Sequence, residues 1–118
     1  MLKSSLGASM TTTARQTLDS ITTERQLLDF VTSYARAHHW LAYHTHRSDH
    51  SPAGFPDLCM VRGRRIVFAE LKREKGKTTP AQDQWLKALL LVADVSGGAV
   101  QVYVWRPSDV GTIMEVLK

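Results

Sequence analysis

The sequence predicts an α/β fold in which helices flank a mixed central sheet. One observation is the order of its elements, which alternates helix, three strands, helix, strand and helix. A second is a tight turn at Gly63-Arg64, which would pair two of the strands as an antiparallel hairpin. A third is the long helix before the last strand, whose crossover allows that strand to pair in parallel. We expect a flexible N-terminal segment at residues 1–20 and a single domain over residues 21–118.

The first helix is predicted from Thr22 to about His38 or His39. Thr22 or Thr23 can cap it, and Glu24 lies in its first turn. Its apolar residues recur at helical spacing: Leu27, Leu28, Val31, Tyr34 and Ala35.

Three strands follow, separated by a loop and by the hairpin turn. The strands are expected over Trp40–His46, Asp57–Arg62 and Arg65–Lys72. The loop between the first two, Arg47–Pro56, is dense in Ser, Asp, Gly and Pro.

A second helix is predicted after a charged loop over residues 73–78. Thr79 would be its N-cap and Pro80 its first residue, while Gln82 would close a capping box. The side chains expected on its buried face are Trp85, Leu86, Ala88, Leu89 and Val92. A strand over Ala99–Trp105 and a short helix from Pro107 complete the chain.

Composition narrows the classes of protein. The single cysteine, Cys59, rules out an internal disulfide, and no segment is apolar enough for a signal peptide or a membrane span. We therefore expect a soluble, intracellular protein. The chain carries a net charge of +4, but seven basic residues against two acidic ones place +5 between Arg62 and Lys77. Such a basic segment favours a polyanionic partner, although a solvated turn is an alternative interpretation.

The third strand ends in a carboxylate and an amine on one face. Side chains two apart point the same way in a strand, so Glu70 and Lys72 share a side. The hairpin would bring Asp57 beside Glu70. Two adjacent carboxylates repel unless a cation or a proton lies between them, and Mg²⁺ suits such a pair. An alternative is that Glu70 and Lys72 are a surface pair and Asp57 a turn residue.

Three blocks of sequence resemble one nuclease family. Gly54-Phe55-Pro56-Asp57-Leu58, Glu70-Leu71-Lys72 and Pro80-Ala81-Gln82-Asp83-Gln84-Trp85 are similar to the virus-type replication-repair nuclease (VRR-NUC) branch of the PD-(D/E)XK superfamily. The resemblance extends from about Thr22 to the C-terminus and implies a PD-(D/E)XK core. It also implies a metal-dependent DNA endonuclease that acts as a homodimer on branched DNA or Holliday junctions.

The resemblance assigns roles to particular residues. Asp57, Glu70 and the backbone carbonyl of Leu71 would bind Mg²⁺ or Mn²⁺, and Lys72 matches the catalytic lysine. Glu24 and Gln82 match residues near the metal. Both also have structural alternatives, since Glu24 suits a helix N-terminus and Gln82 a capping box, and the two roles of Gln82 would compete.

The residues expected to contact DNA are basic or polar and lie in the loop before Gly54 and in the basic segment: Arg47, Ser48, Arg64, Arg65, Arg73, Lys75 and Lys77. Other interpretations remain open. The chain could be a non-enzymatic DNA-binding module that retains the nuclease fold, or a restriction-type enzyme. A zinc site among His38, His39, His44, His46 and His50 lacks supporting spacing, and we interpret the three tryptophans as packing residues.

Overall fold

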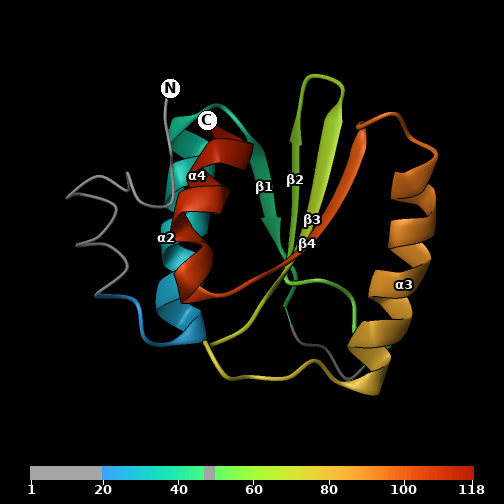
Figure 1. Ribbon diagram of the computed structural model, residues 1–118, viewed down its shortest axis with the longest axis horizontal. Helices are drawn as coiled ribbons and strands as arrows, with labels where there is room; N and C mark the ends of the chain where they lie inside the picture. The colour runs from blue at the N-terminus through green and yellow to red at the C-terminus, as the bar shows by residue number, and fades with distance from the viewer. Residues whose placement is uncertain (1–19, 47–49) are drawn as a thin grey trace.

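A four-stranded mixed sheet forms the centre of the molecule (Figure 1). The structure is a computed structural model, and it describes residues 20–46 and 50–118. The strands lie in the order β1-β2-β3-β4, and their bounds are Leu41–His44, Leu58–Arg62, Arg65–Leu71 and Val100–Trp105. β1, β2 and β3 pair antiparallel, whereas β4 pairs with β3 in parallel. The expected α/β class and mixed sheet are confirmed, while the predicted segment at residues 1–20 lies almost wholly outside the described residues.

Each of the three predicted hairpin strands is slightly longer than the strand observed. Trp40 lies before β1, Asp57 before β2 and Lys72 after β3. Trp40 is buried and donates its indole N–H to the carbonyl of Leu117 at 2.9 Å, so it packs as a core residue. Asp57 still lies beside β1, because its carbonyl accepts the backbone N–H of Thr45 at 2.8 Å.

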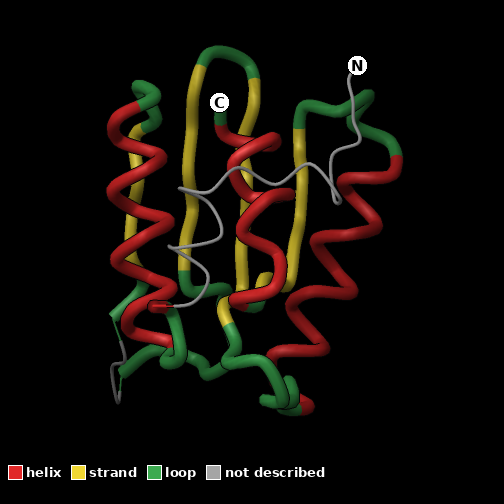
Figure 2. Tube along the Cα trace, turned by 60° about the vertical axis from the view of Figure 1, so that its left-hand side comes forward, coloured by secondary structure: helices red, strands yellow, loops and turns green. Residues whose placement is uncertain are grey.

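Helices α2 and α4 cover one face of the sheet, as the ribbon and tube views show (Figures 1 and 2). α2 spans Glu24–Ala37 and begins at a capping box between Thr23 and Gln26. α4 spans Val110–Leu117 after a short 3₁₀ turn at Pro107–Asp109. Apolar side chains from both helices and from this face of the sheet form the main core: Leu27, Val31, Ala35, Leu58, Met60, Val67, Ala69, Leu71, Trp105, Val110, Ile113 and Leu117.

Helix α3, Pro80–Asp94, lies on the other side of the sheet and packs against β4. Its predicted N-cap and capping box are confirmed. Its predicted buried face is wrong in part: Leu86 is buried and Trp85 and Leu89 are half-buried, but Ala88 and Val92 are exposed. The reason is that β4 is an edge strand, so the sheet covers α3 on one side and leaves its other sides exposed to solvent.

Two arginines, Arg62 and Arg65, lie at the hairpin end of the sheet and contact the ends of the helices there. Arg62 and Arg65 place their guanidinium groups over the Trp40 ring, 4.6 and 4.9 Å from its centroid. Arg62 also donates to the carbonyls of His38 and Lys118, and Arg65 donates to Val116. These contacts satisfy carbonyls at the C-terminal ends of α2 and α4, where no intrahelical donor remains. Within the described residues, no helix is long and apolar enough to cross a membrane.

Candidate active site

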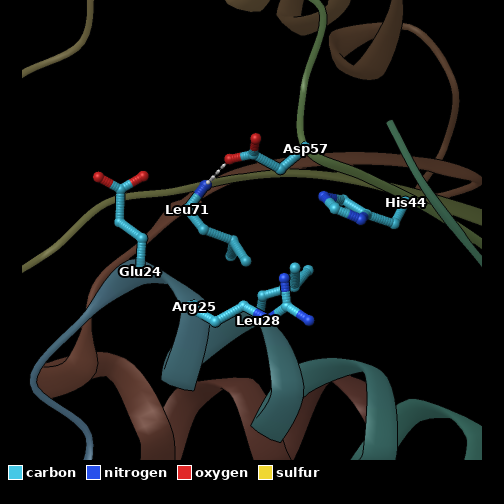
Figure 3. Close-up of a pocket in the computed structure, with 6 residues that line it drawn as sticks. All are labelled: Glu24, Arg25, Leu28, His44, Asp57 and Leu71. Carbon is cyan, nitrogen blue, oxygen red and sulfur yellow. Dashed lines mark hydrogen bonds between the residues drawn. The ribbon is translucent and has the colours of Figure 1, made fainter. Parts of the chain in front are cut away.

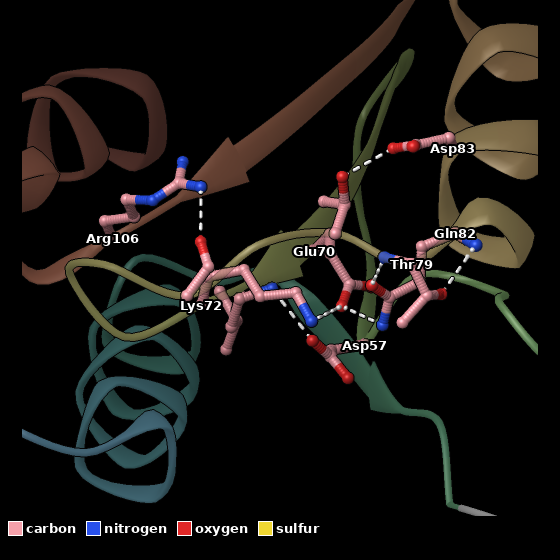
Figure 4. Close-up of polar contacts among 10 residues, drawn as sticks. Asp57, Glu70, Lys72, Thr79, Gln82, Asp83 and Arg106 are labelled. Carbon is pink, nitrogen blue, oxygen red and sulfur yellow. Dashed lines mark hydrogen bonds and ion pairs between the residues drawn. The ribbon is translucent and has the colours of Figure 1, made fainter.

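Asp57 and Glu70 lie at the opposite end of the sheet from the hairpin turn. Leu58 pairs with Ala69, so the residues one step further, Asp57 and Glu70, are neighbours across the β2–β3 ladder. Asp57 is held in place by the backbone N–H of Leu71, which donates to its Oδ2 at 2.8 Å (Figure 3), and its side chain lies near those of Glu70 and Lys72 (Figure 4). The pairing inferred from the sequence therefore holds.

Glu70 is a buried carboxylate with an incomplete set of partners. Its side chain is 2% exposed, and its Oε2 accepts from Gln82 Nε2 at 2.8 Å and lies 3.7 Å from Lys72 Nζ. Its Oε1 is buried and has no hydrogen-bond partner among the described residues. Burial, followed by the charge of Asp57, raises the pKa of Glu70 to about 8, although Lys72 opposes the shift.

Lys72 is the second buried charged residue at this end. It is 8% exposed, and its backbone N–H donates to the carbonyl of Trp105 at 2.9 Å, which extends the β3–β4 pairing by one step. A buried ammonium carries a desolvation cost unless a carboxylate or another acceptor compensates it. The ion pair with Glu70 therefore makes Lys72 part of the site, and the alternative of an exposed surface pair is excluded by its burial.

Gln82 both closes the capping box of α3 and contacts the Glu70 carboxylate, the two roles that were expected to compete. Its Oε1 accepts the backbone N–H of Thr79 at 2.9 Å and closes the capping box, while its Nε2 donates to Glu70. The expectation that these roles compete is wrong, because an amide carries an acceptor and two donors at separate atoms. The capping box fixes the side chain in the orientation that reaches the carboxylate.

The loop before Asp57 positions α3 against the site. Gly54 has φ +99°, and a Cβ placed there would lie 2.4 Å from the carbonyl oxygen of Ala81, in the first turn of α3. Only glycine permits this approach. Phe55 then packs edge-on against Phe68 of β3 and Trp85 of α3, with ring centroids 6.0 and 5.0 Å apart. The contacts of Gly54 and Phe55 with α3 thus bring Gln82 within reach of Glu70.

Glu24 shares a small open pocket with Asp57 (Figure 3). The pocket has a volume of about 140 Å³ and is also lined by Arg25, Leu28, His44 and Leu71. Glu24 thus lies in the same pocket as Asp57, and it also begins α2. His44 and Arg25 were not among the predicted site residues. The signal for His44 was its place on the strand beside β2, where it pairs with Leu58 next to Asp57.

The basic segment does not form one continuous surface. Arg73, Lys75 and Lys77 are exposed in the loop between β3 and α3, at the site end. Arg64 is exposed at the hairpin turn, and Arg65 is engaged by Gln101, Val116 and the Trp40 ring. The seven residues of β3 separate the two groups, which corresponds to about 20 Å. The residues expected to contact DNA therefore fall into two separate groups, one at each end of β3, while Arg47 and Ser48 lie outside the described residues.

The donor atoms of the site suit a small, hard cation, although the set is sparse. No group of three or more His, Cys, Asp or Glu side chains placed to hold a metal occurs in the described part of the chain. The expected ligand set, two carboxylates and the Leu71 carbonyl, is smaller than such a group, and Mg²⁺ commonly uses only one or two carboxylates. The unpartnered Glu70 Oε1 is the observation that fits a cation. Comparisons with protein-family models, curated proteins and solved structures find no match to this chain.

Proposed function

We propose that this protein is a metal-dependent DNA endonuclease whose centre consists of Asp57, Glu70 and Lys72. The observation that carries the proposal is the buried Glu70 carboxylate, with one oxygen unpartnered and with Asp57 beside it. In the absence of a cation this arrangement costs free energy, because burial and like charge both oppose ionisation. Buried acidic groups with strongly raised pKa values are concentrated at functional sites, which favours a functional role for Glu70.

Asp57, Glu70 and the Leu71 carbonyl would hold the cation, Mg²⁺ or Mn²⁺. When bound, such an ion lowers the pKa of its water and polarises a phosphate oxygen. The protein residues prepare the site for it. The Leu71 N–H orients Asp57, and Gln82 orients Glu70 through a hydrogen bond to Oε2, which leaves Oε1 free to coordinate.

Lys72 would stabilise the negative charge that develops on the phosphate during hydrolysis. Its ammonium is almost fully buried and lies beside Glu70, so it acts in a medium of lower dielectric than water. Glu24, which lines the same pocket as Asp57, would orient water or a cation ligand. Exposed Arg73, Lys75 and Lys77 lie at this end of the sheet and would attract the DNA backbone.

We also propose that the chain belongs to the nuclease family that its sequence resembles. A mixed sheet flanked by helices, with an acidic pair and a lysine at the end of two antiparallel strands, is consistent with a PD-(D/E)XK core of the VRR-NUC branch. Selectivity for branched DNA or Holliday junctions rests on the resemblance alone. The rival function, DNA binding without catalysis, leaves the buried Glu70 carboxylate and the half-buried Asp57 beside it without a role.

The test is cleavage of end-labelled DNAs with Mg²⁺, Mn²⁺ or EDTA, by the wild type and by Glu70→Gln. The substrates are a four-way junction, a flap, a splayed arm, a single strand and a plain duplex. We expect metal-dependent cleavage by the wild type and a rate lower by at least about 100-fold for Glu70→Gln, which removes a ligand charge without changing the side-chain shape.

A matched control is Ser33→Glu, on the exposed side of α2, which should cleave as the wild type does. Symmetric cutting of the junction would support the resolvase assignment, and cutting of other DNAs would retain the nuclease but not the junction preference. Folded wild-type protein that binds DNA but cleaves none of these substrates would contradict the proposal and favour the non-enzymatic module.

A further inference from the structure

The α3 side of the sheet is covered only in part. A helix with its side chains is about 10–12 Å wide and strands lie about 4.8 Å apart, so one helix covers about two strands. On this side α3 packs against β4 (Figure 1). No helix among the described residues covers the half that β1 and β2 form here. Three apolar side chains of this half are exposed, and we call them the open sheet face: Leu41, Tyr43 and Val61.

Tyr43 lies on the same face of the sheet as the Glu70 carboxylate. Tyr43 pairs with Cys59 across β1 and β2, and Cys59 pairs with Phe68 across β2 and β3. Paired residues point to the same face, and so does Glu70, which follows Phe68 by two positions in β3. Gln82 of α3 reaches Glu70 from that side. The open sheet face is therefore continuous with the candidate active site.

The spacing between Tyr43 and Glu70 suits a strand of nucleic acid. Two strand separations of about 4.8 Å and two residues of about 3.3 Å place their Cα atoms roughly 12 Å apart. One strand of stacked DNA rises about 3.4 Å per nucleotide, so this distance corresponds to about four nucleotides, and to fewer when the strand is extended. A strand whose phosphate lies at Glu70 can thus bring a nearby base over Tyr43.

The surroundings of Tyr43 suit a base and its phosphate. Tyr43 is 62% exposed, and its side chain makes no hydrogen bond or ring contact with another described residue. Leu41 and Val61 extend the apolar surface towards the hairpin turn. Exposed Lys75 and Lys77 lie in the loop at the site end of the sheet. Surfaces that bind single-stranded nucleic acid combine these two features, an aromatic ring for the base and nearby positive charge for the backbone.

We propose that Tyr43 stacks on an unpaired base of the DNA strand that is cleaved. In a duplex, neighbouring base pairs cover each base face, so an aromatic side chain on a sheet stacks on a base that is unpaired, splayed or terminal. The inference rests on the proposed nuclease function for the position of the phosphate, and it names the substrate class. The substrate is DNA with an unpaired nucleotide within about four positions of the cleaved phosphate.

The first experiment measures the affinity of the full chain for a labelled single strand and for a duplex of the same length, in EDTA, which prevents metal-dependent cleavage. We expect Tyr43→Ala to weaken single-strand binding by about 5- to 150-fold and duplex binding by less than about twofold. Tyr43→Phe, which keeps the ring, should bind as the wild type does. The matched control is Leu91→Ala, which truncates an exposed apolar side chain of α3 and should bind both DNAs normally. Circular dichroism confirms that each variant is folded.

The second experiment locates the stacked base. 5-Iodouracil replaces successive bases in the unpaired arm of a splayed DNA, and light crosslinks it to an aromatic side chain on which it stacks. Mass spectrometry of the digested protein identifies the crosslinked residue. We expect a crosslink to Tyr43 from a position within about four nucleotides of the cleaved bond. A crosslink to a different residue at every position would overturn the proposal.

The outcomes separate this inference from the proposed function. Unchanged single-strand affinity in Tyr43→Ala would overturn the stacking role and leave the open sheet face to a protein partner. Equal losses for single strand and duplex would overturn it too, because stacking on an unpaired base distinguishes the two DNAs. If the wild type cleaves DNA in either case, the nuclease is retained and this inference alone fails. The expected crosslink in a protein that cleaves no DNA would support the base contact and contradict the nuclease function.

Discussion

The two ends of the sheet both hold charged groups, but Arg62 and Arg65 at the hairpin end are half-buried, whereas Glu70 and Lys72 at the site end are buried, and the two ends satisfy these groups differently. At the hairpin end, Arg62 and Arg65 have carbonyl or amide oxygens as acceptors and stack over Trp40. At the site end, Glu70 Oε1 is buried without a partner, and so is the indole N–H of Trp105. Both buried unpartnered side-chain atoms found in the described residues thus lie at one end. The difference separates a group of charges whose donors have acceptors from one in which a buried acceptor has no partner.

Trp40→Ala gives the largest expected effect and tests the structural end. It removes a buried aromatic side chain, its hydrogen bond to Leu117 and the surface on which two guanidinium groups stack. We expect the free energy of unfolding to fall by about 3–5 kcal/mol, measured by urea denaturation. The stabilisation by Mg²⁺ that the proposed metal site predicts should be the same as in the wild type, because that site lies at the other end of the sheet. A loss of that stabilisation would show that the two ends are coupled.

Glu70→Gln tests the opposite prediction, that the site end is strained without a cation. Because the pKa of Glu70 is raised to about 8 from an ordinary 4.5, the folded protein binds this proton more tightly than the unfolded chain does. The free energy of unfolding therefore falls as pH rises from about 4.5 to 8. A neutral amide does not undergo this loss. In EDTA at pH 9, we expect Glu70→Gln to be more stable than the wild type by at least about 2 kcal/mol.

Added Mg²⁺ should reverse this order at high pH. Cation binding needs the ionised carboxylate, so the rise in melting temperature of the wild type on adding Mg²⁺ should grow between pH 6 and 9 (roughly the range around the raised pKa). Glu70→Gln should show little of this rise. Equal melting curves for the two proteins in EDTA at every pH would contradict the strained carboxylate, whatever the outcome of the cleavage assay.

Local sequence signals predicted the elements and part of the site. Thr79 and Gln82 specify the start of α3 through contacts within four residues, and the Gly63 turn fixes the register that joins Asp57 to Glu70. What depends on distant pairing was missed. His44 enters the pocket because β1 pairs with β2. The exposure of Val92 follows from α3 lying beside an edge strand, which no helical periodicity encodes.

The basic segment shows most clearly that residues close in the sequence need not lie close together in the structure. Arg65 and Lys75 are ten residues apart in a segment that reads as one cluster of charge, yet β3 carries the chain from one end of the sheet to the other between them. A strand advances about 3.3 Å per residue, so a charge cluster that contains a strand is divided by it.

Lys75→Ala and Arg64→Ala form a matched pair that tests this division with the smallest expected effect. Each removes one exposed positive charge, Lys75 at the site end and Arg64 at the hairpin turn. With DNA bound in EDTA, which prevents metal-dependent cleavage, we expect Lys75→Ala to reduce the slope of log affinity against log salt by about 0.9. Arg64→Ala should leave the slope nearly unchanged. Each phosphate contact releases its own counterion, so the slope reports contacts and not net charge, which is the same in both variants. Equal losses in the two variants would mean that DNA contacts both ends of the sheet. The difference between the hairpin end and the site end would then hold for the protein's interior but not for its DNA-binding surface.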